Sequence, residues 1–268
     1  MKYEFTSPRD CTLSELLGEK LSFIGKKGLK SLIKERQVRV NGERVGEDVR
    51  LETGDVVEAY VTARAPSVKV IYADDNIVVA DKPAHTDTMS LPLLLSGEYG
   101  ELFPVHRLDV NTTGLVALAR NRAAKEELER EFKARKIKKK YIATVVGAPK
   151  ADRGTLRHWL VKDAVGGLVK AYPTASHGGA ESVTEYETIG RDGELTVLAL
   201  YPSTGRTHQL RVQLAAEGTP ILGDGKYGDY AANKRYKASE QRLRAVSLRL
   251  VGASGVLASL RNREFTAE

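Results

Sequence analysis

The sequence predicts an α+β protein in which a small unit of helices and strands precedes a larger domain with a mixed, mainly antiparallel sheet. Two observations lead to this class. Residues 12–62 hold two amphipathic helix patterns and a hairpin pattern, which suffice for a compact unit. After residue 70, apolar strand-like runs alternate with few helices and lack the repeated βαβ rhythm of a doubly wound sheet. We therefore expect domains at 1–62 and 70–268, joined by a linker at 63–69.

Helices open the small unit and strands close it. In "TLSELLGEKL" the leucines recur at helical spacing, and Thr12 followed by Glu15 is a capping-box pattern. "KKGLKSLIKERQ" repeats the amphipathic pattern. "VRVNGERV" then alternates apolar and polar residues around Asn-Gly, a strong hairpin signal, and "TGDVVEAYV" adds a strand.

Charge is segregated within this small unit. The stretch 20–44 is strongly basic and the stretch 45–60 is mainly acidic, so the unit has one basic face. The whole chain carries a net charge of +7, which favours an anionic partner.

The larger domain reads as strands with one clear helix. We expect strands at "NIVVADKP", "LVALAR", "YIATVVG" and "LTVLALY", and a helix at "AAKEELEREFKARK". The stretches 84–104 and 148–180 carry prolines and glycines and are expected to be long connections. "GDGKYG" is expected to be an ordinary turn, because it lacks the strand-turn-helix setting of a phosphate loop.

Composition excludes several classes of protein. The apolar runs are far shorter than the roughly 18 residues that a membrane span needs. The first residues lack the apolar core of a secretory signal, and Cys11 is the one cysteine, so we expect a cytoplasmic protein without disulfides. The five histidines are scattered without metal-ligand spacing, so we expect no metal.

One carboxylate stands out in "VHRLDVNTTGLVALAR", residues 105–120. Asp109 follows the basic pair His106 and Arg107 and precedes the turn-forming Asn-Thr-Thr-Gly. A structural aspartate that caps a helix or solvates a turn does not need an arginine two residues upstream. The loop is therefore a candidate for chemistry.

Four segments together carry a resemblance to a known family: "DKPAH", "HRLDVNTTGL", "KARKIKKKYIATVVG" and "STGRTHQLRVQLAAEGTPILGDGKYG". In this order they resemble the RluA-type family of RNA pseudouridine synthases, over residues 12–250. The resemblance implies the pseudouridine synthase fold and an isomerase that converts uridine to pseudouridine in structured RNA, ribosomal or transfer RNA. That reaction needs one ionised carboxylate, acting through a covalent adduct or a glycal route, and no cofactor or metal.

The small unit resembles the α-L RNA-binding module first described in a ribosomal small-subunit protein. A module of this kind ahead of the catalytic domain is common in the family. Lysines and arginines of the second helix and the hairpin would then meet phosphates. We expect this role for Lys26, Lys27, Lys30, Lys34, Arg36, Arg39 and Arg44.

The resemblance also implies roles in the catalytic site. The family's catalytic aspartate falls on Asp109, and its arginine partner falls on Arg211. Tyr141 would pack on the target base. Arg107 would insert where the base leaves its stack, although a phosphate contact is nearly as good an interpretation. We expect further substrate contacts from His106, Arg206, His208 and Lys140.

The segment "THQLRVQLAAEG" fits both an alternating strand and a helix. Thr207 as N-cap and Gly218 just beyond the end favour the helix. Arg211 would then lie in the first turn and face the pocket, while Leu210 and Leu214 face the core. Burial opposes charge on a carboxylate, and an arginine at contact distance offsets this.

Two functions remain open at this point. One is the isomerase, as a monomer. The other is an RNA-binding or ribosome-assembly protein that retains the fold without catalysis. Asp109, Tyr141 and Arg211 favour the enzyme. Gln213 stands where family members often have histidine, which leaves the choice of RNA undecided.

Overall fold

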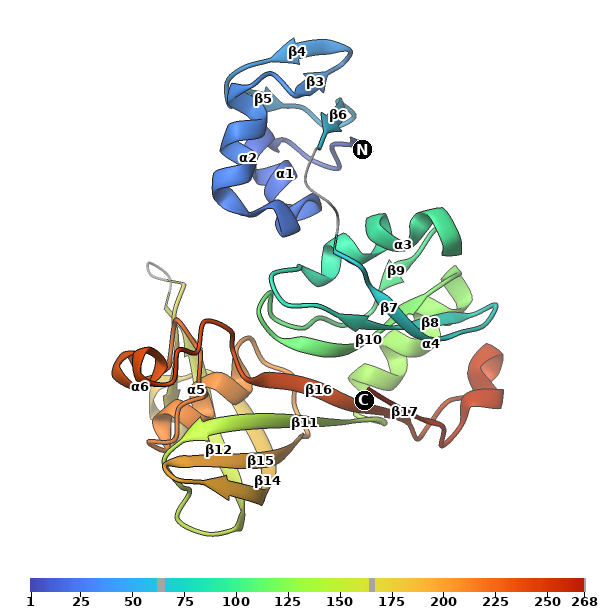
Figure 1. Ribbon diagram of the computed structural model, residues 1–268. Coiled ribbons are helices and arrows are strands. Elements are labelled where there is room, and N and C mark those ends of the chain that lie inside the picture. The colour runs from blue at the N-terminus through green and yellow to red at the C-terminus, as the bar shows by residue number, and fades with distance from the viewer. Residues whose placement is uncertain (62–65, 164–166, 268) are drawn as a thin grey trace.

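The structure of the protein is a computed structural model, and it describes residues 1–61, 66–163 and 167–267 (Figure 1). The side chains of residues 22, 26 and 176 are outside this description. The part of the expected linker at 63–65 and the side chain of Lys26 therefore lie outside the described residues.

The N-terminal part of the chain forms its own sheet and its own core. The sheet has the order β1-β6-β3-β4, and a short pair β2-β5 lies beside it. Leucines from the first helix are fully buried in a cluster with Val38, Val57 and Ala59 of the sheet. Its elements are β1 (Lys2–Thr6), β2 (Cys11–Thr12), α1 (Leu13–Lys20), η1 (Ser22–Ile24), α2 (Gly25–Lys34), β3 (Val38–Val40), β4 (Glu43–Val45), β5 (Arg50–Leu51) and β6 (Val56–Tyr60).

The structure confirms two local features that the sequence predicts in this part, a capping box and a hairpin turn. Thr12 accepts a hydrogen bond from the backbone of Glu15, whose side chain accepts one in return, which is the capping box that the sequence predicts. Asn41 and Gly42 have φ angles of 51° and 85° and connect β3 to β4, as the Asn-Gly signal requires. The strand β1, which pairs with β6, was not predicted.

A large mixed sheet dominates the rest of the chain. Its order is β13-β12-β14-β15-β11-β16-β10-β8-β7, with β17 beside β16 and β9 beside β10. β10 and β16 are parallel, and the other pairs in the described part of this sheet are antiparallel, which confirms the predicted class. The strands are β7 (Lys69–Ala73), β8 (Ile77–Lys82), β9 (Phe103–Pro104), β10 (Thr113–Ala119), β11 (Ile137–Val146), β12 (Arg153–Lys162), β13 (Val169–Tyr172), β14 (Ala180–Asp192), β15 (Leu195–Pro202), β16 (Leu243–Leu250) and β17 (Glu264–Thr266).

Helices pack against this sheet, and two expected connections are more regular than the sequence suggested. The stretch 84–104, predicted to be a long connection, contains η2, α3 and β9, and the stretch 148–180, predicted likewise, contains β12, β13 and η3. The helices are η2 (Thr88–Ser90), α3 (Leu91–Tyr99), α4 (Arg122–Lys133), η3 (Ala175–His177), α5 (Gln209–Ala216), α6 (Tyr230–Arg235) and η4 (Gly255–Leu260).

The ambiguous segment after residue 206 is a helix, α5, as predicted. Its N-cap is not Thr207 as predicted but His208, whose backbone is left-handed with a φ of 55°. Gly218 has a φ of +75° just beyond the end, as expected. Leu210 and Leu214 belong to the core, while Arg211 lies in the first turn.

The long strands β11 and β16 run across the middle of the large domain in Figure 1. One core cluster combines β8, β10 and β11 with α3 and α5, and another combines β10 and β16 with α4 and η4. The loops at the ends of these strands are therefore anchored by strands that are packed in the core. No described helix is long and apolar enough to span a membrane.

The N-terminal unit contacts the large domain near η2. The Ser90 hydroxyl donates a hydrogen bond of 3.1 Å to the carbonyl of Glu19, at the end of α1. Leu93 packs against the N-terminal core. This contact matters below, because η2 also holds the loop that carries Asp109.

Candidate active site

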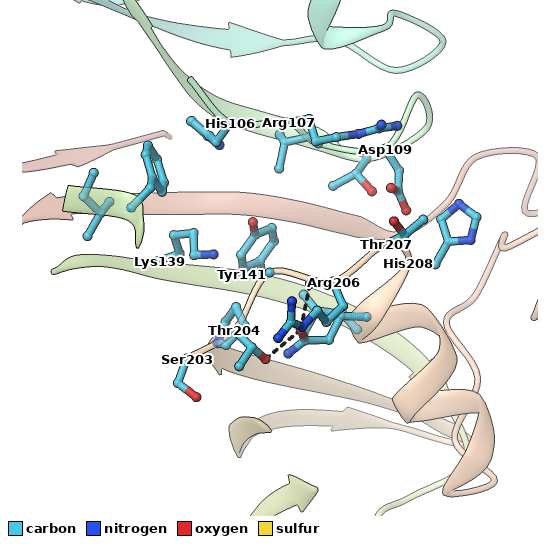
Figure 2. A pocket seen from close by; sticks show the side chains of 18 of the residues that line it. His106, Arg107, Asp109, Lys139, Tyr141, Ser203, Thr204, Arg206, Thr207 and His208 are labelled. Carbon is cyan, nitrogen blue, oxygen red and sulfur yellow. Dashed lines mark hydrogen bonds between the residues drawn. The ribbon is translucent and has the colours of Figure 1, made fainter. Parts of the chain in front are cut away.

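A cavity of about 610 Å³ opens between β11 and the loops that follow β9 and β15 (Figure 2). Three segments that are distant in sequence supply most of its wall: 105–112, 132–141 and 202–211. It brings together the expected site residues His106, Arg107, Asp109, Tyr141, Arg206, His208 and Arg211.

Asp109 and Arg211 are in direct contact at this cavity. Arg211 Nη1 donates a hydrogen bond of 2.9 Å to Asp109 Oδ2, although the two residues are 102 positions apart. The side chain of Arg211 is 9% exposed and that of Asp109 is 19% exposed, so water screens the pair only in part. The family partner that the resemblance assigned to Asp109 is thus in contact with it.

A second carboxylate holds Arg211 from the other side. Arg211 Nε donates to Asp224 Oδ2 at 2.7 Å, and Nη2 donates to Oδ1 at 2.9 Å. This two-point geometry fixes the plane of the guanidinium. Asp224 lies in "GDGKYG", for which the sequence predicts an ordinary turn. It is a turn whose carboxylate is 1% exposed and also accepts backbone hydrogen bonds from Lys226 and Tyr227.

The charges in this network support one another. Burial opposes the charge of Arg211, but hydrogen bonds and charges from Asp224 and Asp109 outweigh it and raise the pKa of the guanidinium. Burial also opposes the charge of Asp224, and Arg211 together with two backbone N–H groups lowers its pKa nonetheless. The ring of Tyr227 lies 5.1 Å from the Arg211 guanidinium carbon.

Tyr141 faces the cavity from the centre of β11. Tyr141, Ala143 and Val145 are buried on one face of the strand, as the alternation predicts. Burial and the charge of Asp109 raise the pKa of the Tyr141 phenol, so it keeps its proton at neutral pH.

The loop that carries Asp109 is held by a buried lysine. Lys82, at the end of β8, is fully buried and donates to the carbonyls of Pro83, Thr86 and Val110 at 2.8–3.0 Å. Burial lowers its pKa to about 8. This lysine is part of "DKPAH", and no local pattern in the sequence predicts that it connects two loops.

Thr88 of η2 provides a second attachment. Its hydroxyl accepts a hydrogen bond of 3.0 Å from the Leu108 backbone N–H and lies 3.2 Å from the Leu108 carbonyl. The 3₁₀ turn that contacts the N-terminal unit therefore also fixes the residue next to Asp109.

His106 and Arg107 differ in their surroundings. His106 Nε2 accepts a hydrogen bond of 2.9 Å from the Ala117 backbone N–H, and its ring packs on Phe132. Burial, with a contribution from the charge of Lys139, lowers the pKa of His106 to about 3, so the ring is neutral. Arg107 is exposed at the rim of the cavity and free to meet a ligand.

The comparison with known families decides the identity of this site. The sequence profile of the RNA pseudouridylate synthase family matches residues 74–216, which include Asp109, Tyr141 and Arg211. The chain belongs to this family. It is accordingly an RNA pseudouridine synthase, an isomerase.

Named relatives of this pseudouridine synthase agree. It is 30% identical to "Ribosomal large subunit pseudouridine synthase C" of Vibrio vulnificus, over 81% of this chain and 76% of the relative. It is 36% identical to "Dual-specificity RNA pseudouridine synthase RluA" of Escherichia coli O6:H1, over 64% of this chain and 82% of the relative. The solved structure "Human RNA Pseudouridylate Synthase Domain Containing 1" superposes with a TM-score of 0.62 at 26% identity, covering 69% of this chain and 78% of that one.

Three further predicted site residues of the pseudouridine synthase differ in where they lie. His208 donates to or accepts from Tyr227 Oη at 2.8 Å, and burial lowers its pKa. Arg206 is exposed at the rim. Lys140 is outside the cavity lining, with its ammonium 5.9 Å from the Tyr201 ring centroid. Its neighbours Lys138 and Lys139 line the cavity instead, and the register of β11 shifts between Lys140 and Tyr141.

Gln213, one of the departures from the family pattern, is a buried structural residue of the synthase. It is fully buried, accepts from Thr184 at 2.7 Å and donates to the carbonyls of Leu156 and Ser182. Its polar groups thus bridge α5 to β12 and β14 and do not reach the cavity.

The basic residues of the N-terminal unit are outward-facing. Lys27, Lys30, Lys34, Arg36 and Arg44 are exposed, and Arg39 is half-buried. Within the described part of the chain, no group of three or more histidines, cysteines or acidic residues could hold a metal ion.

Proposed function

We propose that the protein isomerises specific uridines of a structured RNA to pseudouridine, with ribosomal RNA as the first candidate and transfer RNA as the second. The names of the relatives support this order, since one refers to the large ribosomal subunit and another to dual specificity. The observation that carries the proposal is the contact of Asp109 with Arg211 in a cavity whose rim is basic.

Asp109 is the group that acts on the nucleotide. Its carboxylate forms an adduct with the sugar or base, or removes a sugar proton on the glycal route, and both routes need it ionised. Arg211 donates one hydrogen bond to this carboxylate and thereby orients it.

The reaction is balanced without any other reactant. The N1–C1′ bond breaks and its electron pair goes to N1. The detached uracil turns, and a C5–C1′ bond forms. The proton on C5 leaves and N1 takes up a proton, so the formula of the nucleotide does not change.

The other residues bring the uridine to the carboxylate. The ring of Tyr141 offers a flat face to the base. Arg107 occupies the place of the flipped base in the RNA or binds a phosphate, which offsets a flipping cost of a few kcal/mol. The N-terminal unit adds phosphate contacts through its exposed lysines and arginines.

Mapping pseudouridine in cellular RNA tests the proposal. Deleting the gene should remove one or more sites from ribosomal or transfer RNA, and the wild-type gene should restore them. A gene carrying Asp109→Ala should restore none. If no site disappears on deletion, the protein uses its fold as an RNA-binding scaffold and the proposal is wrong.

A further inference from the structure

Lys139 is a cation in the cavity wall that has no partner in the described part of the protein. It lies on β11 two residues before Tyr141 and lines the same cavity. No hydrogen bond or ion pair to its ammonium occurs among the described residues, although it is partly buried. Burial lowers its pKa. An ammonium that loses water without gaining an acceptor costs free energy, which a ligand that supplies the acceptor would recover.

The position of Lys139 relative to Asp109 indicates which part of a ligand it meets. In Figure 2 the two side chains lie on opposite sides of Tyr141. The electrostatics agree, because the charge of Lys139 acts on His106 while the charge of Asp109 acts on Tyr141 and His208. The cavity thus has a carboxylate end and an ammonium end with an aromatic ring between them.

A uridine placed for reaction spans these two ends. Its C1′ must lie at Asp109, where the glycosidic bond breaks, and its base lies along the ring of Tyr141. The edge of uracil furthest from N1 carries the O4 carbonyl. That edge then points away from Asp109, toward Lys139.

We propose that Lys139 Nζ donates a hydrogen bond to O4 of the target uracil and stabilises the base as it leaves the sugar. This inference rests on the proposed function. When the N1–C1′ bond breaks, the pair left on N1 is delocalised over O2 and O4. The ammonium stabilises that charge without giving up a proton, and the base rejoins through C5 as described above.

The same contact selects uracil. Cytosine has an amino group in place of O4, which would present a donor to the ammonium and leave it without an acceptor. Lys139 is therefore a specificity-determining residue as well as one that stabilises the departing base.

The test combines changes in the protein with changes of single atoms in the RNA. The RNA is a short stem-loop carrying the uridine found by mapping, with uridine, 4-thiouridine or 2-thiouridine at that position. Single-turnover rates are measured for wild type, Lys139→Met and Lys139→Arg. The control is Lys162→Met, which removes one exposed lysine at the end of β12.

With uridine, we expect Lys139→Met to lower the rate by about 10²-fold, the scale of one lost donor to developing charge, and Lys139→Arg to lower it by about tenfold or less. Sulfur accepts hydrogen bonds poorly, so the rate ratio of uridine to 4-thiouridine should be larger in wild type than in Lys139→Met. Lys162→Met should behave as wild type, and thermal unfolding should show that all variants fold.

Two results would overturn the role of Lys139. One is an equal 4-thiouridine effect in wild type and Lys139→Met. The other is a rate ratio of uridine to 2-thiouridine that differs between wild type and Lys139→Met while the ratio for 4-thiouridine does not. A wild-type protein that forms no pseudouridine even with uridine would instead contradict the proposed function.

Discussion

Arg211 binds Asp224 through two hydrogen bonds of 2.7 and 2.9 Å, and this pair leaves Nη1 to reach Asp109. Asp224 therefore sets the orientation of the guanidinium that contacts the proposed catalytic carboxylate. Asp224 is not one of the residues that line the cavity, and it acts through Arg211.

Asp224→Asn should weaken both catalysis and stability. The amide can accept one hydrogen bond but brings no charge, so Arg211 is free to turn away from Asp109. We expect kcat to fall about 10- to 100-fold with little change in KM, because small misplacements of an orienting group are costly. Urea unfolding should show a loss of about 3 kcal/mol for breaking a buried pair. Asp152→Asn, in the exposed pair with Arg191, should cost less than about 1 kcal/mol.

The acid sensitivity of the protein should decrease in the same variant. The pKa of Asp224 is lowered in the folded protein below its ordinary value of 3.8, so its stabilising effect is complete above that pH. It is lost as the pH falls further and the carboxylate takes up a proton. Unfolding measured from pH 5 down to pH 2 should therefore be steeper in wild type than in Asp224→Asn; equal slopes would contradict this assignment.

Lys82→Met should change how stability responds to alkaline pH. Folding lowers the pKa of Lys82 from 10.5 to about 8, so below pH 8 the lysine is charged in both states and its burial cost is complete. Between pH 8 and 10.5 only the unfolded chain keeps the proton, and stability rises by up to about 3 kcal/mol. Urea unfolding at pH 7.5 and 10.5 should show this rise in wild type and in Lys162→Met, and not in Lys82→Met.

The same variant should lower the rate of isomerisation. Without the ammonium, the carbonyls of Pro83, Thr86 and Val110 lose a common donor, and the residue that follows Asp109 is no longer tied to the loop 83–86. We expect kcat to fall at least about tenfold. An unchanged kcat would show that the loop is held by Thr88 without help from Lys82.

Local signals predicted much of this fold because their causes are local. The capping box at Thr12, the Asn41-Gly42 turn and the helical reading of the segment with Arg211 depend on neighbours in sequence. The contact of Arg211 with Asp109 is an expectation from the family resemblance, and in the structure the two side chains form a hydrogen bond.

The parts that escaped prediction depend on distant contacts. Strands β12 and β14 are stabilised by pairing with each other, and nothing in 148–180 reveals that partner. Asp224 sits between glycines and reads as a turn until Arg211 is brought to it. Lys139 and Lys140 are equally basic in sequence, and only the pairing of β11 with its neighbours decides which one faces the cavity.

The N-terminal unit should contribute to the salt dependence of RNA binding. Lys27, Lys30 and Lys34 are exposed on α2 and carry no ion pair within the described residues. Replacing all three by alanine should weaken binding to the mapped RNA and reduce the slope of log affinity against log salt by about 2 to 3, if each lysine neutralises one phosphate. Filter binding from low to high KCl measures the slope. A slope equal to that of wild type would contradict a role of this helix in RNA binding.

The release of the proton on C5 tests the central claim most directly. Purified protein is mixed with ribosomal and transfer RNA transcripts that carry tritium at C5 of uridine, and tritium in the solvent is counted. Wild type should release it in proportion to the pseudouridine formed, and Asp109→Asn, folded to the same extent, should release it at least about 10³-fold more slowly. Tritium release by Asp109→Asn at the wild-type rate would contradict the account.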